Sequence, residues 1–372
     1  LVTKRKVPVF LGSSFAFMGG IMAVIGNSRA GDPDFLEKLA ATKGALIIAG
    51  LVYVAFALII KLVGYEKVNK VLPPIVTGPV IIVIGLRLSS SAINNAFYVN
   101  GEFSLKALFV TVCVLATVIA ISIFAKGIFN LMPILFAIIV GFIVSYAMGF
   151  CDFTTVREAH FFSFMDKSIR DQLLCVPVFR ADAILAIAPI ALVTMVEHVG
   201  DITTNSAVTG QNFMVDPGVH RTLLGDGLAT ALAGLLGGPA NTTYGENTGV
   251  LAVTKNYDPS IIRIAAVFAI LLGMFGKIGA VITSIPSPVI GGISIVLYGM
   301  ISSVGVRIIV NERLNFGDSR NLMIAAVILV LGIGCDSIPV YGTVTISGLA
   351  LSALVGIVLA QILPESEDSV LK

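Results

Sequence analysis

Acidic residues within apolar runs are the side chains of this sequence that could do chemistry. Glu246 lies in the segment 241–249, ahead of an apolar run, and Glu197 directly follows the apolar run 184–196. A carboxylate at the centre of a membrane helix costs about 2.5–3.5 kcal/mol even on the lenient insertion scale, so such acids usually bind a substrate or a proton. Both are therefore candidate ligands for a polar solute. The alternatives are a structural tie between helices for Glu246 and an interfacial carboxylate for Glu197.

A second acid follows Glu197 at helical spacing. Asp201 lies four residues later, which places both carboxylates on one helix face if the helix continues that far. Two acids in a poorly solvated pocket resist double ionisation, so the pair can hold a proton at neutral pH. This spacing predicts proton coupling, with a helix cap or a solvated carboxylate as the alternative for Asp201. His198 points roughly 100° away around the helix, and we expect it outside that pocket.

Two segments are rich in hydroxyl residues and broken by glycine. They run over 11–17 and 241–249, and in each a Ser-Ser or Thr-Thr pair precedes an aromatic residue. Unpaired backbone groups are costly in hydrocarbon, so non-helical backbone persists at membrane depth only where protein or a water-filled cavity surrounds it. The two segments therefore predict a site for a small polar ligand near the midplane, with a glycine kink as the alternative.

The similarity between these two segments indicates an inverted repeat. If they are equivalent, the repeat is seven spans long, and each segment lies in the third span of its repeat. Two spans are then expected before Leu1, and the chain also begins without Met. We therefore expect a chain that is truncated at its N-terminus.

The elements that carry these segments are predicted to be membrane helices. Only 12% of the residues are charged and 56% are hydrophobic, whereas soluble domains carry about a quarter charged residues. A span needs about 20 apolar residues to cross roughly 30 Å of hydrocarbon. Twelve spans are predicted, near residues 8–27, 44–64, 72–92, 105–125, 128–149, 182–200, 221–237, 240–256, 261–283, 286–304, 320–335 and 343–363.

The orientation of the spans follows from the Lys and Arg residues of the short loops, which stay on the cytoplasmic side. Four basic groups fall on one side of the predicted spans, so both ends of the chain are expected in the cytoplasm. Arg87, Asp226 and Asp336 lie near predicted span ends and are expected at the interface or at the rim of the pore. The basic groups consist of Lys4, Arg5, Lys6, Lys61, Lys67, Lys70, Lys255, Arg263, Arg307, Arg313 and Arg320.

Composition and motifs argue against several other classes of protein. The net charge is only +2, and the sequence contains no basic run interleaved with aromatic residues of the kind that would indicate nucleic-acid binding. The four cysteines are far apart, and no His lies at metal-ligand spacing. The sequence contains no phosphate-binding loop that would indicate transport driven by ATP. It also contains no nucleophile–base pair that would indicate an enzyme. Transport coupled to an ion gradient, without a cofactor, is the simpler prediction.

Three motifs carry a resemblance to a known family. They lie at 197–200, 216–221 and 238–249, and read Glu-His-Val-Gly, Asp-Pro-Gly-Val-His-Arg and Gly-Pro-Ala-Asn-Thr-Thr-Tyr-Gly-Glu-Asn-Thr-Gly. With them the chain resembles the nucleobase-ascorbate transporter family, and within it the bacterial uracil permease branch. The resemblance covers essentially the whole chain.

This resemblance implies an all-α polytopic membrane protein with a 7+7 inverted-repeat transporter fold, of which this chain would hold about 12 of 14 spans. Short strand-like segments around 13–17 and 243–247 would meet within broken spans. Family members have a core domain and a gate domain and work as dimers. The implied divisions are a first repeat 1–150, an extracellular connection 151–181, a second repeat 182–363 and a cytoplasmic tail 364–372.

The resemblance also implies roles for individual residues. Glu197 would hydrogen-bond the ring N–H groups of a nucleobase and Glu246 would bind it from the other side. The backbone at Phe15 and Gly245 would meet its carbonyl oxygens. The residues expected to support the site or couple the proton are Ser14, Tyr244, Asn247, Asp201 and Glu197.

The function implied is import of uracil with a proton across the bacterial cytoplasmic membrane by alternating access. One departure concerns Asp201, because one uracil permease type has a histidine there and purine-transporting relatives have an acid. A xanthine or purine permease therefore remains an alternative, and an anion transporter of the same architecture is a further one. The sequence Tyr-Gly-Glu-Asn at 244–247 favours uracil.

Overall fold

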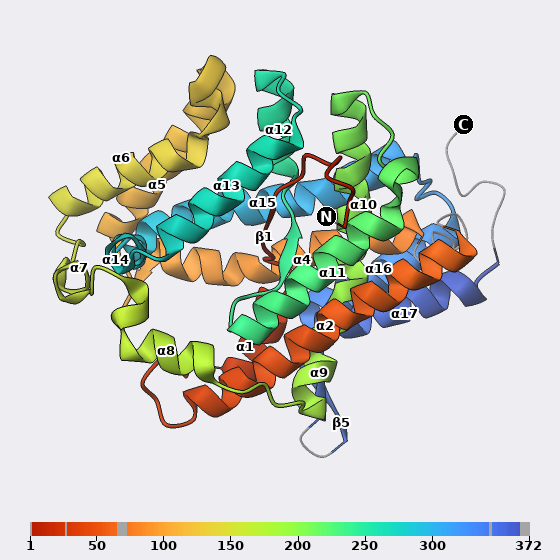
Figure 1. Ribbon diagram of the computed structural model, residues 1–372, viewed down its shortest axis with the longest axis horizontal. Helices are drawn as coiled ribbons and strands as arrows, with labels where there is room; N and C mark the ends of the chain where they lie inside the picture. The colour runs from red at the N-terminus through yellow and green to blue at the C-terminus, as the bar shows by residue number, and fades with distance from the viewer. Residues whose placement is uncertain (1, 27, 65–72, 342–343, 365–372) are drawn as a thin grey trace. The chain divides into compact units, whose positions relative to one another are not determined.

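The computed structural model describes residues 2–26, 28–64, 73–341 and 344–364, and α-helices dominate it (Figure 1). In this part of the chain, five helical segments are long and apolar enough to cross a membrane, and shorter apolar helices accompany them. The prediction of a polytopic helical membrane protein is confirmed. Lys67, Lys70 and residues 365–372 of the predicted tail lie outside the described residues. The five long segments are Phe35–Val63, Pro74–Phe97, Leu105–Phe124, Ala181–Thr209 and Ser287–Asn311.

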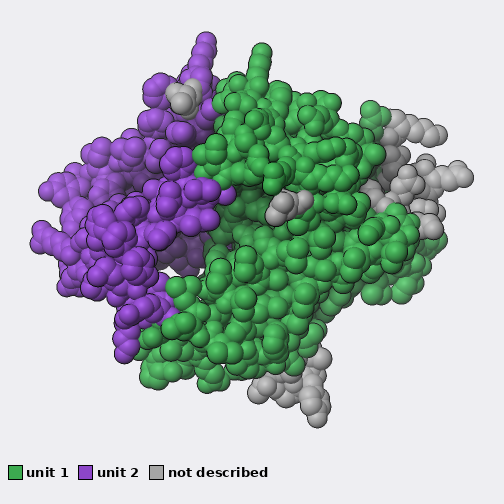
Figure 2. All heavy atoms as spheres, in the orientation of Figure 1, with its two compact units in different colours: residues 1–84, 171–264, 302–372 green, residues 85–170, 265–301 purple. Residues whose placement is uncertain are grey.

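The chain forms two compact units, which Figure 2 colours separately. Unit 1 consists of residues 1–84, 171–264 and 302–372. The elements that lie in it are β1 (Leu11–Ser13), α1 (Met18–Ile25), α2 (Phe35–Val63), α9 (Ala181–Ile187), α10 (Ile190–Thr209), η3 (Met214–Gly218), α11 (Val219–Leu236), β4 (Asn241–Thr243), α12 (Gly245–Thr254), α16 (Ser319–Gly334), β5 (Ser337–Tyr341), β6 (Val344–Ser347) and α17 (Gly348–Ile362).

Unit 2 consists of residues 85–170 and 265–301. It contains β2 (Tyr98–Val99), β3 (Glu102–Phe103), α5 (Leu105–Phe124), η1 (Gly127–Leu131), α6 (Pro133–Ala147), α7 (Thr154–Glu158), η2 (Ser163–Met165) and α14 (Gly276–Thr283). The boundaries between the units fall within α4 (Pro74–Phe97), α8 (Lys167–Leu174), α13 (Pro259–Gly273) and α15 (Ser287–Asn311).

Helix α5 shows how these sequences suit a membrane. Val110, Val114 and Val118 recur every four residues on one face and pack in the core of unit 2 against residues of α6 and α15. The opposite face is also apolar although it is exposed, with Phe109 and Ile123 more than half exposed. A helix that is apolar on both its buried and its exposed face is suited to lipid rather than water.

The two hydroxyl-rich segments meet, although they are more than 200 residues apart in the sequence. Strands β1 and β4 pair antiparallel, with Leu11 opposite Thr243 and Ser13 opposite Asn241. Two further bonds extend the pairing, because Ser14 N donates to the Ala240 carbonyl at 2.8 Å and Tyr244 N donates to Phe10 at 3.0 Å. Each strand supplies the backbone partners that the other lacks, which is how a short non-helical segment is tolerated at membrane depth.

The strands begin two residues earlier than expected. They cover 11–13 and 241–243 rather than 13–17 and 243–247. The expected ends are already turning into helices, since Met18 N donates to the Phe15 carbonyl and Asn247 N donates to Tyr244. Helix α1 then begins at Met18 and helix α12 at Gly245. Each broken span is therefore a short strand followed by a helix.

The predicted span 261–283 is also broken, into α13 and α14. The backbone between them is satisfied by the segment before η2, because Gly276 N donates to the Phe161 carbonyl at 2.9 Å and Ser163 N donates to Met274 at 2.8 Å. A Cβ on Gly276 would lie 2.5 Å from the His160 carbonyl oxygen, so the close approach needs glycine. Hydropathy alone predicts one span here because both parts are apolar.

Glycines allow α2 and α11 to pack closely. A Cβ on Gly50 would lie 2.5 Å from the Gly227 carbonyl oxygen, and a Cβ on Gly227 would lie 2.5 Å from Tyr53 Cβ. A Cβ on Gly234 would likewise lie 2.9 Å from Leu46 Cβ. Small residues at this interface let the helix backbones approach, which is how membrane helices associate when hydrocarbon offers no hydrophobic drive.

We expect Gly227→Ala to lower the stability of the protein. The added methyl overpacks the α2–α11 contact, which costs about 1–3 kcal/mol. Gly225→Ala is the matched control, since its Cβ would have only Thr3 Cγ2 nearby, at 3.9 Å. The melting temperature in detergent, followed by size-exclusion chromatography after heating, compares the two variants. Equal melting temperatures would refute the packing argument.

Candidate functional site

The site is organised by a polar stripe on helix α10. Thr194, His198, Asp201 and Asn205 are all buried, and their spacing of four, three and four residues places them on one helix face. Polar side chains at such spacing inside a span are costly unless each has a partner. Their partners come from the neighbouring elements α2, α11, β4 and α12.

The two ends of the stripe are tied to neighbouring segments. Tyr53 of α2 donates its hydroxyl to Thr194 Oγ1 at 2.5 Å. At the other end, Asn205 Nδ2 donates to the Pro8 carbonyl at 3.0 Å and to Thr248 Oγ1 at 3.4 Å. Asn205 therefore joins α10 to the residues before β1 and to α12.

The centre of the stripe is a buried His–Asp–Thr cluster. His198 Nδ1 lies 3.1 Å from Asp226 Oδ2 and 2.6 Å from Thr243 Oγ1. The cluster joins α10, α11 and β4, and the side chains of His198 and Asp226 are only 2% and 0% exposed. Hydropathy places Asp226 near a span end, at the interface or at the rim of the pore, but it does not show that neighbouring elements bury this side chain completely.

Asp201 lies against the start of α12. A Cβ on Gly245 would lie 2.7 Å from Asp201 Oδ1, so the carboxylate occupies the space that a side chain would take. Gly245 is the first residue of α12, and the free backbone N–H groups at a helix N-terminus attract anions. The carboxylate is buried rather than solvated, and it lies at the start of α12 rather than capping the end of α10.

The remaining predicted site residues lie on or beside the two strands and on α10. Ser14 is buried and Phe15 half-buried just after β1, and Asn247 is half-buried in the first turn of α12. Tyr244 donates its hydroxyl to the Ser13 carbonyl at 2.9 Å, which clamps one segment onto the other. Glu197 is half-buried on α10, beside the fully buried His198. The side chain of Glu246 lies outside the described part of the structure.

Several polar atoms around this site are buried without a hydrogen-bond partner among the described residues. Ser14 Oγ and Thr242 Oγ1 belong to the paired segments, while His198 Nε2, Asp226 Oδ1 and Asn205 Oδ1 belong to the helices behind them. An unsatisfied buried group costs about 1–3 kcal/mol. The site therefore combines donors and acceptors that can hydrogen-bond a small polar solute.

Sequence reasoning found both segments and Asp201 but missed the His198–Asp226 pair. The signal was present in the spacing of Thr194, His198, Asp201 and Asn205. For metal binding, no group of three His, Cys, Asp or Glu side chains was found in the part of the chain that the structure describes.

Comparison with known proteins identifies what this chain resembles. Residues 1–340 match the family model Xan_ur_permease, described as a permease family. The chain is 45% identical over 365 residues to a uracil permease of Bacillus caldolyticus, covering 98% of this chain and 82% of that protein. It is 42% identical to the uracil permease of Bacillus subtilis strain 168, covering 99% and 84%.

Solved structures share the fold at low sequence identity. The transmembrane domain of the cyanobacterial bicarbonate transporter BicA superposes with a TM-score of 0.57 at 19% identity, covering 96% of this chain and 85% of that chain. SLC26A9 superposes with a TM-score of 0.64 at 12% identity, covering 97% and 57%. These matches confirm the predicted transporter fold class.

Proposed function

The chain belongs to the permease family that its residues 1–340 match, and we propose that it imports uracil together with a proton. The support for uracil is the identity of 42–45% to uracil permeases over nearly the whole chain. The observation that carries the proposed mechanism is the buried Asp201 carboxylate at the start of α12, beside the paired strands. Permeases move solutes across membranes without changing them chemically, so membership of this family indicates transport rather than an enzymatic reaction.

The chemistry of uracil suits the residues of the site. Uracil offers two N–H donors and two carbonyl acceptors. We propose that Glu197 and Glu246 accept from the N–H groups, and that the backbone at Phe15 and Gly245 serves the carbonyl oxygens. Such a set of partners leaves few of the solute's polar groups unsatisfied when water is excluded.

Proton coupling is proposed for Asp201 with Glu197. Asp201 is buried, and a carboxylate that must leave water is best tolerated when it is paired or protonated. A proton that accompanies uracil would neutralise the site during the movement between inward-open and outward-open states. In this scheme the proton gradient drives transport, and no cofactor takes part.

The proposed setting is the cytoplasmic membrane of a bacterium. The positive loop residues favour cytoplasmic ends, and the division into repeats 1–150 and 182–363 with a connection 151–181 is part of this proposal. A homodimer is likewise proposed. Lipid is the surrounding partner, because the exposed faces of the helices are apolar.

The alternatives predict different uptake. A xanthine permease would take up xanthine and show competition by xanthine rather than by uracil. The bicarbonate transporter BicA shares the fold, so an anion transporter is the other alternative, and it would be expected to place a basic residue between the broken segments. The stretches 7–26 and 238–254 contain no Lys or Arg, which favours a neutral solute.

Uptake of radiolabelled uracil by cells that express the full-length protein tests this proposal. We expect uptake that a protonophore abolishes, that Glu246→Gln abolishes, and that Asp201→Asn uncouples from the proton gradient. Asp258→Asn is the matched control, since Asp258 is a loop residue that caps α13 through Ser260 N. If the cells take up xanthine but not uracil, the substrate is a purine and the chain is a purine permease. Uptake that the protonophore does not affect would exclude proton coupling.

A further inference from the structure

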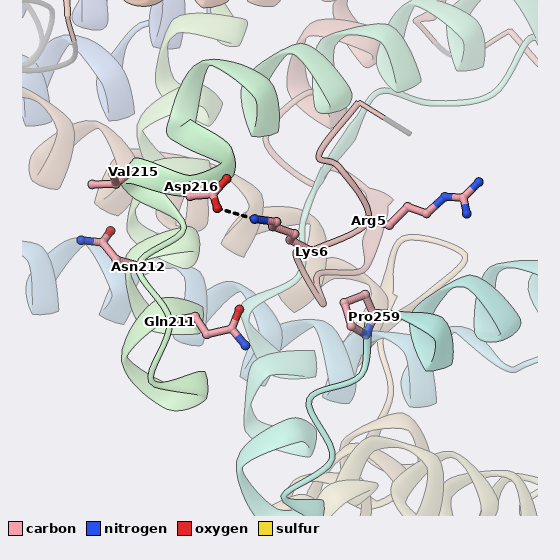
Figure 3. Close-up of a pocket in the computed structure, with 7 residues that line it drawn as sticks. All are labelled: Arg5, Lys6, Gln211, Asn212, Val215, Asp216 and Pro259. Carbon is pink, nitrogen blue, oxygen red and sulfur yellow. Dashed lines mark hydrogen bonds and ion pairs between the residues drawn. The ribbon is translucent and has the colours of Figure 1, made fainter.

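A pocket of about 660 Å³ lies in unit 1, and none of its lining residues belongs to the paired strands (Figure 3). It is lined by Arg5 and Lys6 from the start of the chain, Gln211 and Asn212 after α10, and Asp216 in η3. Its volume lies in the range of small-molecule sites. None of these residues has a role in the proposed uptake of uracil.

The two cations of this pocket have different partners. Lys6 Nζ is bonded to Asp216 Oδ2, and Lys4 Nζ lies 3.4 Å from Oδ1 of the same carboxylate. Arg5 points away from Asp216 in Figure 3, and it makes no hydrogen bond or ion pair within the described residues. Lys4 and Arg5 both have left-handed backbone angles, with φ of 53° and 59°, so this short segment is held in a conformation that non-glycine residues rarely adopt.

The charges around the pocket favour an anion. The pocket is lined by the cations Arg5 and Lys6 and by one acid, Asp216, with which Lys4 also pairs, so these four side chains carry a net charge of +2. Asp258 precedes the lining residue Pro259, but it is engaged by Ser260 N and lies near Arg263.

The pKa of Asp216, which lies in η3 and outside the spans, agrees with this field. The bond from Lys6, with help from Lys4, holds the pKa of Asp216 below its usual range. Asp216 therefore stays ionised near neutral pH, and its ion pairs weaken only as the pH falls through that lowered pKa.

We propose that this pocket binds the phosphate group of an organic phosphate, held by Lys6 and by the Arg5 guanidinium once the Arg5 side chain turns toward the pocket. A guanidinium matches two oxygens of a phosphate with parallel hydrogen bonds, and a lysine adds a compact charge. The phosphate competes with Asp216 for Lys6. A soluble nucleotide and the headgroup of an anionic phospholipid share this chemistry, and the proposed orientation with cytoplasmic ends would put the pocket on the side where both are present.

Two binding arms distinguish the two sources of phosphate. In the first, the full-length protein in phosphatidylcholine nanodiscs is titrated with uridine monophosphate by calorimetry. In the second, native mass spectrometry counts the phosphatidylglycerol molecules that the protein retains from mixed nanodiscs. We expect Arg5→Ala to lower the affinity for whichever of the two ligands binds by about tenfold, because it removes a charge-assisted hydrogen-bond pair.

Two further variants separate this effect from a folding defect. Arg307→Ala removes an exposed cation of α15 that is not part of the pocket, and it is expected to bind normally. Asp216→Asn removes the carboxylate that competes for Lys6, and it is expected to tighten binding. Binding of either ligand that Arg5→Ala and Asp216→Asn leave unchanged, or no binding of both, would overturn the proposal. These readouts do not involve uracil, so they stand or fall separately from uptake.

Discussion

Replacing Asp226 by alanine is expected to destabilise the protein by about 1–3 kcal/mol, because it removes one partner from a fully buried polar pair. His198 Nδ1 would lose its carboxylate partner at 3.1 Å while it remains buried among α10, α11 and β4. Asp226→Asn keeps the shape and one acceptor, so we expect a clearly smaller loss. Thermal unfolding in detergent measures both variants.

A double-mutant cycle shows whether the loss comes from the pair itself. If His198 and Asp226 act together, His198→Ala with Asp226→Ala will lose less stability than the sum of the two single variants. Additive losses would mean that the two residues do not interact in the folded protein. Reduced uracil uptake is also expected in Asp226→Ala, since Thr243 of β4 bonds the same histidine and helps to position the paired strands.

Replacing Gly245 by alanine is expected to reduce uracil uptake by at least about tenfold while the protein still folds. The new methyl would lie 2.7 Å from Asp201 Oδ1, so the carboxylate must leave the first residue of α12. In enzymes, a misplacement of about 1 Å can lower a rate by about a hundredfold, and we expect transport to be similarly sensitive to the position of this carboxylate. Initial uptake rates, corrected for the amount of protein in the membrane, measure the effect.

Gly249→Ala is the matched control for this variant. Gly249 lies one turn further along α12, and a Cβ there would have no atom within 4 Å. It is therefore expected to transport at close to the normal rate. If Gly245→Ala transports as well as Gly249→Ala, the contact between Asp201 and α12 has no role in transport.

The sequence predicted the segments of the site better than their partners. The hydroxyl-rich stretches 11–17 and 241–249 are visible because glycine and polar residues interrupt apolar runs. The strands begin two residues and end four residues earlier than expected, because the point at which a strand becomes a helix depends on which backbone groups the opposite strand satisfies. The roles of Glu197 and Glu246 in binding remain predictions.

Asp226 shows what hydropathy cannot predict. Hydropathy averaged over a window indicates whether a whole segment lies in lipid or in water. The burial of one side chain depends instead on which face of its helix a neighbouring helix covers. The same limit explains the span 261–283, whose two parts are equally apolar but whose break is supported by Gly276 and the Phe161 carbonyl.

The amino-acid sequence by itself determined that this is a membrane protein, that the spans containing 11–17 and 241–249 are interrupted, and which family the chain resembles, because composition and local motifs carry that information. Only the tertiary structure decided that β1 pairs with β4, that His198 bonds Asp226, and that Asp201 lies against Gly245. The physical reason is that each of these contacts joins residues far apart in the chain. Their distance and burial are properties of the packed helices and not of any one segment.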